Sequence, residues 1–123
     1  MKLDMDLVRA ILLQAEAAPP NQFPKIELPE YPEDAITEHI QLLAERGLLD
    51  AAIAPSGFGS KRIATAFVRR LTWQGHEFLQ NAKNEQVWER TKRFIKDKGG
   101  TVSFELFKDV LMRIASQHLG LSP

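Results

Sequence analysis

Four basic residues are concentrated in one short part of the chain, around a segment rich in glycine and serine. Lys61 and Arg62 follow the turn-like segment 55–60, and Arg69 and Arg70 come shortly after them. Such side chains bind phosphates, and each contact with a nucleic-acid backbone adds affinity by releasing counterions. We therefore expect phosphate contact here. The alternative is ordinary surface charge, with one of the two adjacent arginines paired to an acidic neighbour, since neighbouring strand residues point to opposite faces.

Two histidines, His39 and His76, could take part in acid–base or metal chemistry near neutral pH. With Glu38 or Glu77 they would form such a site, but no third clear ligand accompanies them. We predict instead that both have structural roles, as hydrogen-bonding or packing groups, and that no metal is bound. No Ser-His-Asp or paired-carboxylate motif is evident, so we expect neither an enzyme nor a cofactor.

Composition narrows the class of protein. The chain has 123 residues, 44% of them apolar, which is enough to form a hydrophobic core without disulfides or a structural metal. Cysteine is absent, which excludes disulfides, thiolate catalysis and Cys-ligated zinc. Lys plus Arg and Asp plus Glu number 16 each, so there is no overall attraction toward nucleic acid, only a local one. No run of apolar residues would span a bilayer and no signal-peptide pattern is present, so a cytoplasmic protein is expected.

The helix expected to position the basic residues and the histidines lies before the basic segment. Its apolar face comprises Ile36, His39, Ile40 and Leu43, and its polar face comprises Asp34, Glu38, Gln41 and Glu45. Gly47 is placed to end it in a left-handed conformation, letting Leu48 fold back on the last turn. On the exposed side only Thr37 and Gln41 suit base reading, and the acidic residues oppose approach to DNA phosphates.

Further elements follow from periodicity and turn residues. Residues 4–17 predict a first helix capped by Asp4, and Lys25–Leu28 alternates as a short strand would. Residues 49–54 and 63–71 predict a two-stranded hairpin, and Thr72 is placed to cap the next helix. Two more helices are expected, from Asn84 to Gly99-Gly100 and from Ser103 onward. The aromatic residues mostly fall at core spacing, Trp73 and Phe94 among them; only Phe58 is placed to stack on a base.

The order of these elements predicts a mainly α (α+β) fold. A helix, two strands joined by a loop and another helix form the second half of a winged helix, so residues 1–83 are expected to form a winged helix-turn-helix-like domain with a two-stranded wing. Residues 84–123 would add a C-terminal two-helix extension packed on it as one structural unit. Pro24, Pro29 and Pro32 leave little room for the second helix that a helix-turn-helix normally has.

Two resemblances support this fold. The string Leu71-Thr72-x-x-Gly75-x-x-x-Leu79 resembles the start of the last helix in many bacterial winged-helix regulators. The whole chain is similar to a family of small uncharacterised bacterial and prophage-type proteins, a domain-of-unknown-function family. That likeness is carried by four strings: Met1-Lys2-x-Asp4-Met5-Asp6-Leu7-x-Arg9-x-Ile11-Leu12, His39-x-x-Leu42-Leu43-Ala44-x-x-Gly47-Leu48, Leu71-Thr72-Trp73-x-Gly75-His76-x-Phe78-Leu79 and Val87-Trp88 through Gly99-Gly100. It implies a winged-helix-like fold.

Two functions remain open from the sequence. The first is a small DNA-binding or transcription-associated protein that contacts DNA through the wing. The contacting residues would be Lys61, Arg62, Arg69, Arg70, Thr37 and Gln41. The alternative is a protein–protein interaction module without DNA binding, using the acidic helix face or the C-terminal helices. A homodimer joined through the Trp88–Phe94 face is also open, as is packing of that face on the first helix of its own chain.

Overall fold

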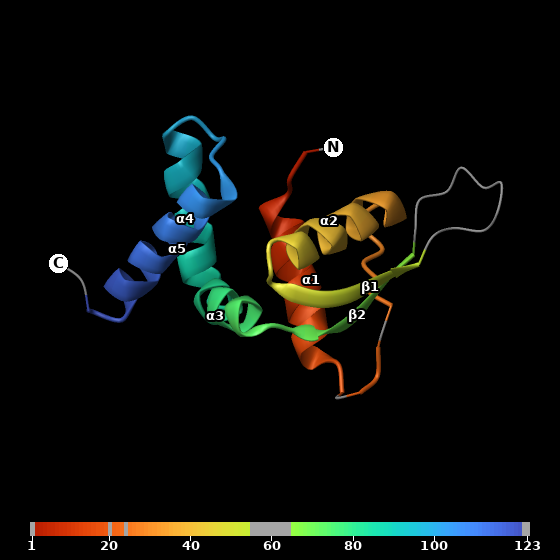
Figure 1. Ribbon diagram of the computed structural model, residues 1–123. Coiled ribbons are helices and arrows are strands. Elements are labelled where there is room, and N and C mark those ends of the chain that lie inside the picture. Colours follow the sequence, from red (N-terminus) through yellow and green to blue (C-terminus); the bar gives the residue numbers. More distant parts are fainter. Residues whose placement is uncertain (1, 20, 24, 55–64, 122–123) are drawn as a thin grey trace. The chain divides into compact units, whose positions relative to one another are not determined.

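The computed structural model describes residues 2–19, 21–23, 25–54 and 65–121. Within these ranges the chain forms five α-helices and one two-stranded antiparallel hairpin, so the protein is mainly helical with an α+β architecture (Figure 1). The chain divides into two compact units, residues 1–76 and 77–123. The boundary between 83 and 84 that the sequence indicates lies further along the chain and stays a prediction.

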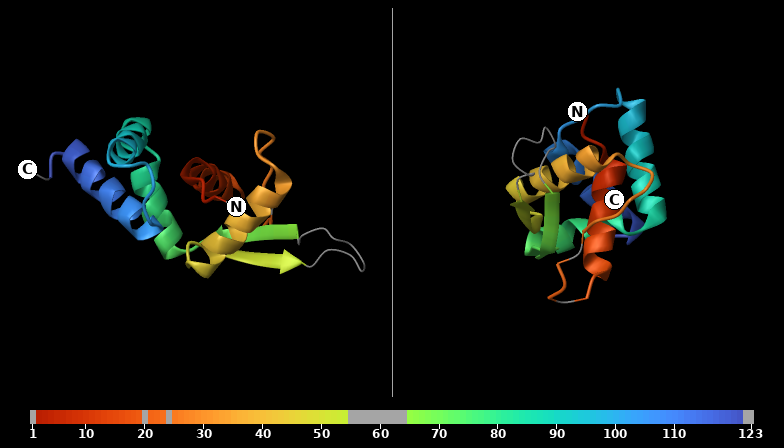
Figure 2. Two further views of the ribbon diagram at one scale, coloured as in Figure 1. Left: turned by 90° about the horizontal axis from the view of Figure 1, so that it is seen from above. Right: turned by 90° about the vertical axis from the view of Figure 1, so that its right-hand side faces the viewer.

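The first unit contains α1 (Met5–Ala17), α2 (Glu33–Glu45), β1 (Leu49–Ala54) and β2 (Thr65–Leu71), and it ends in the first turn of α3 (Trp73–Ala82). Helix α1 packs against α2 and β2, and α2 also packs against both strands (Figure 2). Asp4 caps α1 as expected, because its carboxylate accepts hydrogen bonds from the amides of Asp6 and Leu7. The buried side chains of this unit include Leu7, Val8, Ile11, Leu12, Ile36, Ile40, Leu43, Val68 and Leu71.

Helix α2 ends at the glycine that the sequence indicates. Gly47 has a φ of 84°, and its amide donates to the carbonyl of Ala44 at 3.1 Å. The Leu48 amide donates to the carbonyl of Leu43 at 2.9 Å. These two bonds form a Schellman motif, which satisfies carbonyls that the helix end would otherwise leave unpaired. The chain therefore reverses sharply and enters β1 two residues later.

The short strand predicted at Lys25–Leu28 is wrong. This segment has no strand assignment, yet Ile26 is buried. Its backbone bonds go to a side chain instead: the Glu27 amide donates to Gln14 Oε1 at 2.8 Å, and Gln14 Nε2 donates to the Glu27 carbonyl at 2.9 Å. The Gln14 side-chain amide thus pairs the backbone N–H and C=O of Glu27, as a neighbouring strand would, and links the segment to α1. As the prolines indicated, the described residues between α1 and α2 contain no helix.

The second unit is built on α4 (Glu85–Asp97) and α5 (Phe104–His118), which lie side by side (Figures 1 and 2). Asn84 and Ser103, where the sequence indicates that these helices begin, are their N-caps. Trp88 is 1% exposed and lies against Phe107, with ring centroids 5.2 Å apart. Because Trp88 is buried while Phe94 is 47% exposed, the two do not form one exposed face. Among the described residues, no helix has the length and apolar character needed to cross a membrane.

A compact junction joins the end of α2 to the start of α3 within the first unit. The Thr72 amide donates to the carbonyl of Leu48 at 3.1 Å, and the Thr72 hydroxyl donates to the carbonyl of Gly47. The same hydroxyl oxygen accepts the Gly75 amide at 3.1 Å, which caps α3. A Cβ atom on Gly75 would lie 2.1 Å from the Leu48 carbonyl oxygen. The Leu-Thr-x-x-Gly string is therefore a requirement of close backbone packing.

We predict that Gly75→Ala destabilises the protein. Glycine to alanine in a helix usually gains up to about 1 kcal/mol, but here the added methyl group would overlap the Leu48 carbonyl oxygen. Backbone on both sides must then move, so we expect a net loss of about 1–3 kcal/mol in the free energy of unfolding. Urea denaturation followed by circular dichroism measures it. Gln74→Ala, at the exposed neighbouring position, is the control and should change stability by less than about 0.5 kcal/mol. A Gly75→Ala protein as stable as this control would contradict the prediction.

We also predict that Gln14→Ala loosens the segment that carries Ile26. Two partly solvated hydrogen bonds are lost, which should lower the free energy of unfolding by about 1 kcal/mol. Amide hydrogen exchange at Glu27 should become faster, because its donor loses the Gln14 acceptor. Gln14→Glu keeps an acceptor for that amide but removes the donor to the Glu27 carbonyl, so exchange should stay slower than in Gln14→Ala. Equal exchange rates in all three proteins would show that Gln14 does not hold this segment.

Candidate functional site

The two arginines of the hairpin are presented together by a β-bulge. Asp50 pairs with Arg70 and Ala51 pairs with Val68, so Arg69 is an extra residue in β2. A bulge interrupts the alternation of faces along a strand. Val68 and Leu71 are both buried, and Arg69 and Arg70 between them are both exposed. The expected strict alternation of the two arginines is therefore wrong, and both guanidinium groups are available at the surface.

One of these arginines has an acidic partner, as the alternative from the sequence anticipated. Arg69 Nη1 lies 3.2 Å from Asp50 Oδ1, and their side chains are 49% and 41% exposed. Ion pairs this exposed contribute about 0–1 kcal/mol, so Arg69 is held only weakly. Arg70 Nη1 donates to the Leu71 carbonyl at 3.3 Å. Lys61 and Arg62 lie outside the described residues.

A hollow of about 220 Å³ lies beside the bulge, within the first unit. It is lined by Arg69 and Arg70 of β2, by His76 in the first turns of α3, and by the C-terminal end of α1 with Glu16. The structure thus brings His76 to the arginines, although they lie in different elements. The sequence did not indicate this grouping, because it depends on where α3 begins relative to β2. The two arginines and the histidine around this small hollow suit a phosphate group, whereas the carboxylate of Glu16 opposes one.

The exposed side of α2 has the acidic character that the sequence indicates. Gln41 is exposed and Thr37 is half-buried. Asp34 and Glu45 are exposed on the same helix, and Leu42 is 39% exposed among them. This surface carries negative charge beside an apolar side chain, which is unfavourable for entry into a groove lined by phosphates.

His39 has the structural role that the sequence analysis predicts. It is 1% exposed, its Nδ1 donates to the Ala35 carbonyl at 2.7 Å, and its Nε2 accepts the Asp4 amide at 3.0 Å. The Nε2 bond therefore joins α2 to the N-terminus of α1, and the Nδ1 bond lies within α2. No group of three or more His, Cys, Asp or Glu side chains suited to a metal ion occurs in the part of the chain that the structure describes.

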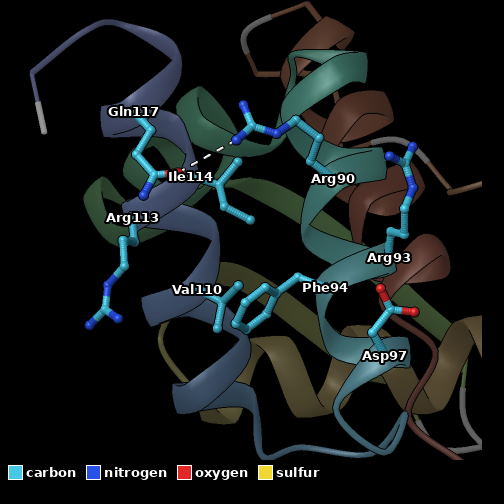
Figure 3. Close-up of a pocket in the computed structure, with 8 residues that line it drawn as sticks. All are labelled: Arg90, Arg93, Phe94, Asp97, Val110, Arg113, Ile114 and Gln117. Carbon is cyan, nitrogen blue, oxygen red and sulfur yellow. Dashed lines mark hydrogen bonds between the residues drawn. The ribbon is translucent and has the colours of Figure 1, made fainter. Parts of the chain in front are cut away.

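Two surface features were missed by the sequence reading. Trp73 is 77% exposed at the start of α3, although core spacing was expected for it. In the second unit, a groove of about 460 Å³ lies between α4 and α5, with an apolar floor and three arginines. Its lining residues are Arg90, Arg93, Phe94, Asp97, Val110, Arg113, Ile114 and Gln117 (Figure 3). Arginines beside Phe94 were the signal in the sequence, but only the packing of α5 shows that they border a groove.

Comparison with known proteins places the chain in a family. Residues 2–101 match the model of the family described as "Hypothetical protein (DUF2513)". A protein of Haemophilus influenzae described as "Uncharacterized protein" is 33% identical over 123 residues, which cover 97% of this chain and 99% of its own length. No solved structure matches the chain. The family match covers most of the chain, including all of the first unit from residue 2 onward, and on that basis the protein belongs to the DUF2513 family.

Proposed function

We propose that this is a small winged-helix protein that contacts DNA through the stem of its β1–β2 hairpin. The observation that carries the proposal is the grouping of Arg69, Arg70 and His76 around one hollow. The order α1, α2, hairpin and α3 supports a winged-helix fold in which α2 occupies the place of the recognition helix and the hairpin that of the wing. Lys61 and Arg62, between the two strands in sequence, would extend the same contact.

The contact would be made mainly to phosphates and not to base edges. The acidic exposed side of α2 repels the DNA backbone, so docking led by α2 in the major groove is disfavoured. Phosphate contacts position a protein on a duplex and carry no sequence information directly. We therefore propose that the hairpin binds the DNA backbone and that Gln41 and Thr37 of α2 contribute less to the contact.

Protein contact is the second candidate. It is favoured by Leu42 lying among acidic side chains on the exposed face of α2, and by Trp73 being 77% exposed. Tryptophan is enriched among the residues that contribute most to protein interfaces. This candidate does not require DNA, and the two are separated by the experiment below.

We expect salt-dependent binding of random-sequence duplex DNA, measured by fluorescence anisotropy at several salt concentrations. Replacing Arg69 and Arg70 with glutamine should weaken binding and reduce the slope of log K against log salt by about 2, since each phosphate contact contributes about 0.9. Replacing Lys61 and Arg62 as well should remove binding. The fold should survive, because the two described arginines are exposed.

A matched control removes the same charge elsewhere. Arg93→Gln combined with Arg113→Gln takes two exposed arginines from the second unit and should leave DNA affinity and its salt slope nearly unchanged. If folded protein does not bind DNA at low salt, or if the control loses as much affinity as the hairpin variant, hairpin-led contact is wrong. Protein contact then becomes the leading candidate.

A further inference from the structure

The groove between α4 and α5 combines an apolar floor with positive rims. Phe94 reaches from α4 toward Val110 on α5, and Arg93 and Arg113 extend on the outer sides of their helices (Figure 3). Arg90 spans the upper part of the groove, with its Nη2 3.5 Å from Gln117 Oε1. Asp97 also lines the groove, so the lining contains three arginines and one carboxylate. Within the described residues, the side chains of Arg93 and Arg113 have no hydrogen-bond or ion-pair partner.

The groove has the length of two helical turns. It extends from Arg90 to Asp97 along α4 and from Val110 to Gln117 along α5. At 1.5 Å per residue each edge is about 10 Å long. A groove of this length between two helices accommodates two turns of an amphipathic helix, with apolar residues on the floor and charged residues on the rims.

The same chain carries a helix surface that matches this groove. On α2, Glu38, Leu42 and Glu45 follow one another at spacings of four and three residues, so they lie on one side over two turns. Leu42 is 39% exposed between the two carboxylates. Neither Glu38 nor Glu45 has a hydrogen-bond or ion-pair partner among the residues that the structure describes.

We propose that the α4–α5 groove binds the α2 surface of a second copy of this chain. Leu42 of one copy would lie on the Phe94–Val110 floor of the other, and Glu38 and Glu45 would face the arginine rims. This inference rests on the protein-contact candidate and is independent of DNA binding. The α2 surface and the α4–α5 groove are different parts of the chain, and each copy has both. In a closed pair, the α2 surface of each copy therefore lies in the groove of the other, which gives two identical contacts.

The distribution of charge along the chain supports a partner of this kind. Residues 1–76 contain eight Lys or Arg and ten Asp or Glu, whereas residues 77–123 contain eight and six. The net charges are therefore −2 and +2, and they cancel in the whole chain. Opposite charges on complementary surfaces raise the rate and specificity of association. A chain with no net charge also lacks the general repulsion that keeps copies apart.

Sedimentation velocity in nucleic-acid-free buffer tests the proposal, over protein concentrations from about 10 µM to about 1 mM, where weak interfaces populate. We expect the weight-average mass to rise with concentration. Glu45→Arg and Arg93→Glu each place like charges across the contact, so each variant should lose at least about tenfold in association constant. Leu42→Ala, which changes no charge, should weaken association as well.

Mixing the two charge variants gives the sharpest outcome. Each alone should associate at least about tenfold more weakly than the unmodified chain, but the arginine introduced in one faces the glutamate introduced in the other, so an equimolar mixture should recover association. Lys96→Glu is the matched control, because Lys96 is exposed on α4 outside the groove; it should associate like the unmodified chain. An unmodified chain that is monomeric at all concentrations, association unaffected by Arg93→Glu, or a mixture that associates no more strongly than either variant alone would each overturn the proposal. None of these results depends on whether the hairpin contacts DNA.

Discussion

The approach of α3 to the end of α2 is the constraint on which the first unit depends. Thr72 uses its amide and its hydroxyl to bind the carbonyls of Leu48 and Gly47, and the same hydroxyl caps α3. Gly75 allows this because it has no Cβ to strike the Leu48 carbonyl. Without the junction, the start of α3 would lose its direct hydrogen bonds to the end of α2. The grouping of His76 with Arg69 and Arg70 follows from it, since His76 is the residue after Gly75.

Side chains replace secondary structure elsewhere in the first unit. The prolines of the segment before α2 disfavour a helix, and its described residues are not paired with a strand. Gln14 supplies both a donor and an acceptor to Glu27 instead. His39 does similar work at the other end of α1, joining the Asp4 amide to the Ala35 carbonyl. The side chains of Gln14 and His39 thus provide hydrogen-bond partners for backbone groups that have none within a helix or strand, and buried backbone groups need such partners in a folded protein.

Both proposed contacts, that of the hairpin with DNA and that of the α4–α5 groove with α2, would pair arginines with negatively charged groups. The bulge at Arg69 exposes two arginines on a unit whose net charge is negative, so any attraction for phosphates is local to the hairpin. The α4–α5 groove collects three arginines over an apolar floor, and α2 offers carboxylates around Leu42. The chain's overall neutrality is the sum of a small negative net charge in residues 1–76 and an equal positive one in residues 77–123. A chain without net charge has no general attraction for nucleic acid, so its contacts depend on local surfaces.

The sequence by itself determined the elements whose signals are local. The Asp4, Thr72, Asn84 and Ser103 caps, the left-handed Gly47 and the bounds of β1 all depend on residues a few positions apart, so periodicity and capping rules suffice. Only the tertiary structure decided the rest. The bulge at Arg69 depends on which residue of β1 each residue of β2 meets, and the pairing of Gln14 with Glu27 depends on where an irregular segment folds back. The exposure of Trp73 and the groove beside Phe94 depend on which neighbours cover a helix face. A single sequence does not contain these distances, because periodicity fixes the direction of a side chain on its own element and not what lies opposite it.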